Sequence, residues 1–319
     1  MIQILLILAG VLLVTYGANI LVSGATTLAQ RMGVSDMVIG LTIVAFGTSA
    51  PELIVSITAA ANGNAELAIG NVIGSNILNI GLILGITGLI RPLTIYRNTT
   101  WKEIPFALLG IMAVWLMASD TEFDQHPPSV LSRSDGLVLL CFFIIFFYYT
   151  LDIAKQNKEP LADAPSPGRS AALAIGLLIG GLIGLTLGGR LIVDNAVILA
   201  RQFGVRESTI GLTLVAVGTS IPELATSITA ALRGNTDIAL GNVIGSNIFN
   251  SFLILGISAT LAPIPAGGIT QLDFLVCMGM TVLLFAMAAW SRKGRIKKID
   301  AGILLAFYVI YTGWLLSTL

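Results

Sequence analysis

Long apolar stretches alternate with short polar ones along almost the whole chain. A helix that crosses a lipid bilayer needs about 20 largely apolar residues. The chain of 319 residues contains ten such stretches, with approximate limits 2–28, 36–61, 67–90, 103–119, 134–152, 171–200, 208–232, 238–262, 271–290 and 300–318. This pattern predicts an all-α integral membrane protein with ten transmembrane helices.

A repeat within the chain divides the predicted helices into two related groups. The segments from Gly47 to Gly85 and from Gly218 to Gly256 are identical at 27 of 39 aligned positions and start 171 residues apart. Five predicted spans separate equivalent points, and because five is odd the second copy has to enter the membrane from the opposite side. We therefore expect two inverted five-helix repeats, residues 1–152 and 171–319, joined by a polar cytoplasmic linker over 153–170.

The positive charges favour one side of the membrane. Thirteen Lys and Arg residues lie in the loops after the odd-numbered spans, three lie in the opposite loops, and Arg190 lies within the sixth span. Cytoplasmic loops of membrane proteins carry the excess of Lys and Arg. We expect a multi-pass protein of the plasma (inner) membrane with both termini outside.

Composition removes several classes of function. Hydrophobic residues make up 55% of the chain and charged ones 11%, and seventeen Lys plus Arg balance seventeen Asp plus Glu, so nothing indicates a nucleic-acid partner. The two cysteines lie in apolar stretches and the one histidine lies in a loop, which leaves no disulfide framework or zinc cluster. With no nucleophile paired to a base and no HExxH motif, we expect neither an enzyme nor a cofactor, and no protein partner can be inferred.

Two glutamates carry the candidate chemistry. Glu52 and Glu223 lie near the middle of otherwise apolar spans, where an ionisable side chain is costly and by default functional. Each follows a proline, Pro51 or Pro222, which cannot donate the backbone hydrogen bond of a helix. The sequence predicts that the second and seventh helices are broken there, and broken backbone at membrane depth is tolerated where it lines a polar cavity.

Helical spacing brings more oxygen atoms to the glutamates. Hydroxyls three and four residues earlier share their face, and a polar stripe recurs every fourth residue in the following span. These residues are Thr48, Ser49, Ser75 and Asn79 in the first copy and Thr219, Ser220, Ser246 and Asn250 in the second, and the stripe begins at Asn71 and Asn242. Oxygen ligands with two carboxylates suit a calcium ion and argue against zinc or copper. The alternatives are hydroxyls bonded to their own helix and a stripe that joins helices, the role we assign to Asn76 and Asn247.

The motifs GTSAPE (47–52) and GTSIPE (218–223), each followed by GNVIGSN (70–76 and 241–247), resemble the alpha repeats of the cation/calcium exchanger superfamily, in its prokaryotic sodium/calcium exchanger branch. The resemblance implies that Glu52 and Glu223 are the central calcium ligands. It also implies that the Thr and Ser residues above line calcium and sodium sites, together with the backbone carbonyls of Ala45 and Ala216. Several members have Asp where this chain has Asn250, which leaves the number and order of monovalent ions open.

The expected function is secondary active antiport of calcium against sodium across a membrane by alternating access. The resemblance implies that the first and sixth spans slide across a fixed core. Protons that bind the same carboxylates, or sodium together with potassium, remain alternative counter-ions. A cation channel with the same pair of glutamates is the alternative from a different class.

Overall fold

The computed structural model describes residues 2–123, 128–156, 170–202, 216–266, 269–291 and 294–318. Nearly all of these residues are helical. The α-helices are α1 (Ile2–Met32), α2 (Asp36–Ile39), α3 (Ala45–Thr48), α4 (Ala50–Ala61), α5 (Glu66–Leu78), α6 (Leu84–Ile90), α7 (Ile104–Met117), α8 (Asp120–Phe123), α9 (Arg133–Gln156), α10 (Ala171–Gln202), α12 (Ala216–Thr219), α13 (Ile221–Leu232), α14 (Thr236–Ile248), α15 (Leu255–Leu261), α16 (Gln271–Ala289) and α17 (Lys298–Thr318).

Within the described residues, four π-helical turns connect or extend these helices, at Gly40–Val44, Asn79–Ile83, Thr99–Glu103 and Phe249–Ile254. The same residues include four strands of two residues each, which form two antiparallel pairs. The strand β1 (Leu93–Thr94) pairs with β4 (Arg295–Ile296), and β2 (Val130–Leu131) pairs with β3 (Ile264–Pro265). Each strand pair therefore joins a loop of the N-terminal half to a loop of the C-terminal half.

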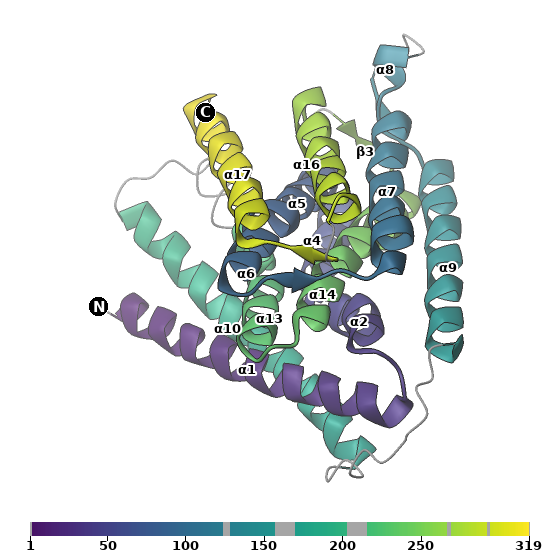
Figure 1. Cartoon of the computed structure of the whole chain (residues 1–319). Coiled ribbons are helices and arrows are strands. Elements are labelled where there is room, and N and C mark those ends of the chain that lie inside the picture. Colours follow the sequence, from purple (N-terminus) through teal and green to yellow (C-terminus); the bar gives the residue numbers. More distant parts are fainter. Residues whose placement is uncertain are drawn as a thin grey trace.

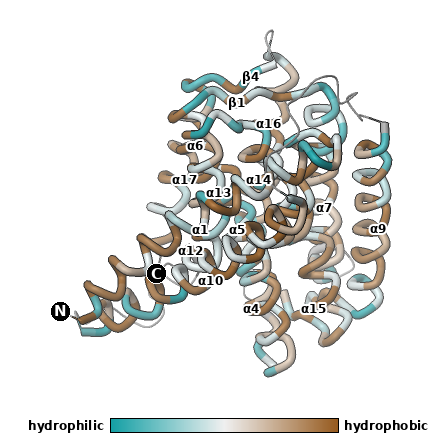
Figure 2. The backbone as a smooth tube through the Cα atoms, turned by 90° about the horizontal axis from the view of Figure 1, so that it is seen from below, coloured by the Kyte–Doolittle hydropathy of each residue, from teal (hydrophilic) through white to brown (hydrophobic). Residues whose placement is uncertain are grey.

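The helices form an integral membrane protein. Within the described residues, eight helices are long and apolar enough to cross a membrane, and the bent pair Asp36–Thr48 and Ala50–Ala61 makes nine if it counts as one span. Large hydrophobic side chains are exposed on the outer helices, such as Leu12, Tyr148 and Ile310. Figure 2 shows hydrophobic residues along helices such as α9 and hydrophilic residues around β1 and β4. Lipid would cover the apolar surface in a bilayer.

The long helices α1 and α10 run antiparallel and pack closely along their length. Their contact is made by small residues seven positions apart, Gly10, Gly17 and Gly24 on α1 against Gly188, Gly181 and Ala174 on α10. A Cβ atom on Gly17 would lie 2.9 Å from the backbone nitrogen of Leu185 and 3.0 Å from the carbonyl oxygen of Gly181. Glycine thus allows the two backbones to approach at a distance that no side chain would fit.

The core lies between this pair and the remaining helices. Figure 1 shows α5, α13 and α14 in the middle, with the α1–α10 pair on one side and α7, α9, α16 and α17 on the other. The helix α14 is almost entirely buried, and it contacts α2 and the π-helical turn at Gly40–Val44. Segments of the two copies of the repeat, far apart in sequence, therefore form one central core.

Most predicted span limits agree with the helices to within a few residues. The predicted span 103–119 begins earlier, at Thr99, because Glu103 is buried and accepts a hydrogen bond from the Tyr149 hydroxyl, so the charged residues lie inside the helix. The predicted linker overlaps α9, which continues to Gln156, and residues 157–169 lie outside the described part. Residues 203–215 also lie outside it, so ten spans remain a prediction.

Candidate functional site

The first glutamate lies directly after a helix break. The helix α3 ends at Thr48, Ser49 has φ −80° and ψ 5°, and α4 begins at Ala50 with Pro51 in its first turn. The helices before and after Ser49 meet at an angle of 44°. Glu52 therefore lies in the first turn of α4, where the positive end of the helix dipole favours a negative charge.

The second glutamate lies in the same local structure. The helix α12 ends at Thr219, Ser220 has φ −89° and ψ 6°, and α13 begins at Ile221 with Pro222 in its first turn. Glu223 again occupies the first turn after the break. Both copies of the repeat thus use a proline and a serine to end one helix and to start another at a glutamate.

The two carboxylates meet at the centre of the protein. Glu52 and Glu223 are each 1% exposed, and each accepts a hydrogen bond from the serine three residues before the other, so the two carboxylates lie near one another. The Ser220 hydroxyl donates to Glu52 Oε1 at 3.0 Å, and the Ser49 hydroxyl donates to Glu223 Oε1 at 2.9 Å. Among the described residues, Oε2 of either glutamate has no hydrogen-bond partner. Two adjacent buried carboxylates without a cation beside them are expensive, so this arrangement favours a positively charged ligand.

The two threonines also bond to the opposite half of the chain. The Thr48 hydroxyl donates to Asn242 Oδ1 at 2.9 Å, and the Thr219 hydroxyl donates to Asn71 Oδ1 at 3.3 Å. Each of these asparagines donates in turn to a serine of its own half. Asn242 Nδ2 lies 3.1 Å from the Ser227 hydroxyl, and Asn71 Nδ2 lies 3.2 Å from the Ser56 hydroxyl.

The predicted serines of the following spans reach the same cluster. The Ser75 hydroxyl lies at hydrogen-bond distance, 3.1 Å, from the Ser220 hydroxyl, and Ser246 donates to Glu223 Oε1 at 3.4 Å. Ala45 precedes the first break, and its carbonyl oxygen accepts bonds from the Ser49 backbone nitrogen at 3.0 Å and from the Thr48 hydroxyl at 3.3 Å. Ala216 is the first residue of α12.

The predicted asparagines, Asn79 and Asn250, lie one helical turn beyond those serines, where π-helical turns begin at Asn79 and at Phe249. Such turns often occur at functional sites. Both side chains are 1% exposed, and among the described residues neither Oδ1 atom has a hydrogen-bond partner. The structure thus supplies two amide oxygens and two carboxylate oxygens that are buried and unsatisfied.

Several side chains of this network lie outside the predicted set of ligands. They are Ser56, Asn71, Asn76, Ser227, Asn242, Asn247 and Ser251. For Asn71 and Asn242 the spacing was a sufficient signal, because they begin the stripe that continues at Ser75 and Ser246. For Asn76 and Asn247, which lie one position off the stripe, the only available signal was their presence in both copies of GNVIGSN.

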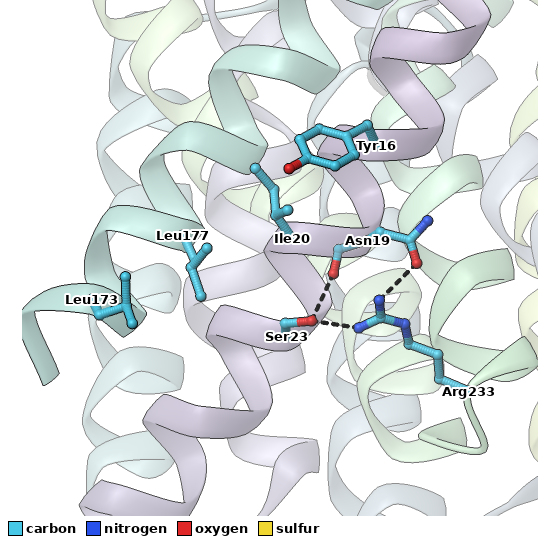
Figure 3. Close-up of a pocket in the computed structure, with 7 residues that line it drawn as sticks. All are labelled: Tyr16, Asn19, Ile20, Ser23, Leu173, Leu177 and Arg233. Atoms are coloured by element: carbon cyan, nitrogen blue, oxygen red, sulfur yellow. Dashed lines mark hydrogen bonds between the residues drawn. The ribbon is translucent and has the colours of Figure 1, made fainter. Parts of the chain in front are cut away.

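A pocket of about 390 Å³ lies away from this cluster, between α1, the start of α10 and the end of α13. None of the predicted ligands lines it. Figure 3 shows Arg233 extending from the end of α13 to α1, where it donates to the Ser23 hydroxyl at 2.5 Å and to Asn19 Oδ1 at 2.7 Å. Asn235 adds a bond to the Thr26 hydroxyl at 2.7 Å. These three bonds tether the turn between α13 and α14 to α1.

The donor set of the central cluster consists of oxygen atoms. Within the described residues, no group of three or more His, Cys, Asp and Glu side chains is placed to hold a metal ion. Calcium takes six to eight oxygen ligands from carboxylates, carbonyls and amides, whereas zinc and copper prefer nitrogen and sulfur. The cluster of two carboxylates, hydroxyls and amide oxygens therefore fits a hard cation rather than a transition metal.

Comparisons with known proteins agree with this chemistry. The family described as "Sodium/calcium exchanger protein" matches residues 2–151 and 173–317. The inner membrane protein YrbG of Escherichia coli is 35% identical, over 90% of this chain and 89% of that protein. The sodium/calcium exchanger MaX1 of Methanosarcina acetivorans is 30% identical, over 97% of each chain.

A solved structure extends the similarity to the fold. The sodium-calcium exchanger NCX_Mj, in crystals soaked with 10 mM Na⁺ and zero Ca²⁺, superimposes with a TM-score of 0.85 at 35% identity, over 98% of each chain. The match spans both copies of the repeat and the helices around them. The chain belongs to the sodium/calcium exchanger family, a family of cation/calcium antiporters.

Proposed function

We propose that this protein exchanges calcium for sodium across the membrane by alternating access. One calcium ion would bind between Glu52 and Glu223, and sodium ions would compete for the same oxygen atoms. The observation that carries the proposal is the pair of buried carboxylates, each with one oxygen bonded to a serine of the opposite half and the other without a partner among the described residues. A divalent cation would neutralise both charges at once.

The proposed architecture is two inverted five-helix repeats, residues 1–152 and 171–319, with both termini outside. The hydrogen bonds between the two halves support it, because they occur in reciprocal pairs. Thr48 with Asn242 is matched by Thr219 with Asn71, and Ser49 with Glu223 is matched by Ser220 with Glu52. Substrate sites at the interface of such repeats are common in secondary transporters.

Coupling follows from competition for two negative charges. A ligand can shift a conformational equilibrium only through different affinities for the two states. We infer that the site without a cation resists the change of side, because two unpaired carboxylates would then be enclosed by apolar helices without water or a cation. Calcium or the counter-ions would each relieve this cost in turn.

Uptake of radioactive calcium into proteoliposomes tests the proposal. Vesicles loaded with sodium should accumulate calcium against its gradient, and those with Glu52→Gln should not. Uptake driven only by a pH gradient would replace sodium by protons, and a need for potassium as well as sodium would make the exchange potassium-dependent. Net calcium flux down its own gradient, without any gradient of a counter-ion, would indicate a channel and reject antiport.

A further inference from the structure

Two amide pairs cross between the halves of the protein, next to the candidate ion ligands. Asn79 Nδ2 donates to Asn247 Oδ1 at 2.9 Å, and Asn250 Nδ2 donates to Asn76 Oδ1 at 3.1 Å. All four side chains are buried. Each pair combines one residue of the predicted stripe, Asn79 or Asn250, with one residue outside it.

The pairing determines which atom each stripe asparagine presents. The NH₂ group of Asn79 or Asn250 donates to its partner, so the oxygen of the same amide points away from the pair. That oxygen has no hydrogen-bond partner among the described residues. An asparagine side chain can rotate by half a turn and exchange its oxygen for its NH₂ group. The rotated form would present N–H groups, which repel a cation, in place of the oxygen that would bind it.

We propose that Asn76 and Asn247 are positioning residues, which hold the amide oxygens of Asn250 and Asn79 toward the transported cations. The inference rests on the proposed function and extends it to residues that are not themselves ligands. An acceptor opposite each NH₂ group makes the orientation with the oxygen toward the site the stable one. A buried amide oxygen left without a partner is costly, and this cost becomes available as binding energy for the cation.

The two pairs are not supported equally. Asn76 Nδ2 donates to the buried Ser251 hydroxyl at 3.0 Å, which fixes the orientation of Asn76 itself. The equivalent of Ser251 in the first copy is Ile80, whose side chain has no polar atom and cannot orient Asn247 in this way. The amide of Asn250 is therefore oriented through two residues, and that of Asn79 through one.

Ion binding to the purified full chain tests this inference, measured as the rise in melting temperature with Ca²⁺ or Na⁺ concentration. Asn76→Leu and Asn247→Leu remove the amide oxygen that accepts the hydrogen bond from the stripe asparagine. Each variant should raise the Kd for at least one of the two ions about tenfold. Asn76→Asp and Asn247→Asp keep an acceptor of the same shape and should bind within threefold of the wild type or more tightly. In transport, the leucine variants should raise the apparent KM more than they lower the maximal rate.

Leucine variants that bind both ions within twofold of the wild type would overturn the inference. If a leucine variant does not fold, Ser251→Ala tests the same chain of contacts, because it removes the hydrogen bond that orients Asn76. This variant should raise the Kd about threefold, and an unchanged Kd would equally overturn the inference. A wild-type protein that neither ion stabilises would instead reject the proposed function, so the two failures are distinguishable.

Discussion

Most side-chain hydrogen bonds at the centre of the molecule occur in reciprocal pairs, whereas those at the ends of α4 and α13 do not. At the centre, Ser49 bonds to Glu223 and Ser220 bonds to Glu52, each across the two halves. At the ends, the turns Asn62–Asn64 and Arg233–Asn235 have the same backbone, with a glycine at φ +80° in one and +87° in the other. Within the described residues, however, side chains tether only the second turn to a long helix, which is α1.

This difference separates two requirements of a carrier. The candidate ligands have to be held in one arrangement, and bonds from both halves do so at the centre. A carrier that opens to one side at a time has to hold its two sides differently at any moment. Within the described residues, α1 packs along α13, whereas α10 makes few contacts with α4. The ends of the helices therefore differ between the two sides more than the reciprocal bonds of the candidate ligands do.

The largest effect is expected from removing one charge at the centre. Glu52→Gln and Glu223→Gln should each lower calcium transport at least about 100-fold, because a divalent cation would then face one carboxylate in a buried site. The two losses should agree within a few-fold if the halves contribute equally. Calcium uptake into sodium-loaded proteoliposomes provides the measurement.

Glu103→Gln is the matched control for these variants. Glu103 is also buried, but it bonds to Tyr149 and lies outside the central cluster. Its variant should retain transport within about threefold of the wild type. Equal losses in all three glutamine variants would mean that burying any glutamate in this protein matters for folding, and the central pair would lose its special role.

The next largest effect is expected on calcium affinity, and it should differ between the two halves of the central cluster. Ser49→Ala and Ser220→Ala each remove a hydrogen bond to a carboxylate, which is worth about 1.5–3 kcal/mol, so the calcium affinity should fall about tenfold or more. Ser220→Ala should be the more damaging, because Ser220 also contacts Ser75. Ser258→Ala, at a buried serine on α15, should leave the affinity unchanged. A smaller effect of Ser220→Ala than of Ser49→Ala would contradict this asymmetry.

The sequence was sufficient to predict the site residues that differ chemically from their surroundings. Glu52 and Glu223 were found because an ionisable residue in an apolar span needs a reason. Pro51 and Pro222 identified the helix breaks, which the structure has at Ser49 and Ser220. These inferences depend on the residue type and on local spacing, and both can be read from one sequence.

The individual bonds between the halves at the centre could not be predicted, because they join residues about 145 to 194 positions apart. The assignment of Asn76 and Asn247 to bonds between helices is confirmed, but the sequence did not indicate that their partners are Asn250 and Asn79. A stripe predicts which side of a helix faces inward when another side faces lipid, but α14 is buried almost all round, so a position off the stripe still meets polar partners. Nothing in the sequence indicated that Arg233 would bond to α1, since a charged side chain in a loop normally faces water.

A smaller effect, on stability, is expected where α1 meets α10. Gly17→Ala places a methyl group within 3.0 Å of the α10 backbone, so it should lower the free energy of unfolding by about 1–3 kcal/mol. Gly180→Ala is the matched control, because its Cβ would lie 3.7 Å from Ile20 in ordinary contact. That variant should be neutral, or more stable by up to about 1 kcal/mol from helix propensity. Thermal unfolding in detergent compares the two variants, and equal melting temperatures would contradict the close contact.

The smallest effect is expected from the tether, and it tests the separation of centre from ends. Arg233→Ala removes two hydrogen bonds at an exposed position, together worth about 1 kcal/mol, which is a factor of about five in an equilibrium constant. Spin labels on α1 and on the turn after α13 should report a larger fraction of molecules in which the two are apart. Calcium affinity should stay within twofold, because the tether does not touch the ligands. Asn62→Ala, at the equivalent position of the other turn, should change neither quantity. An Arg233→Ala variant that weakens calcium binding as strongly as Ser49→Ala would show that the ends and the centre are not separable in this protein.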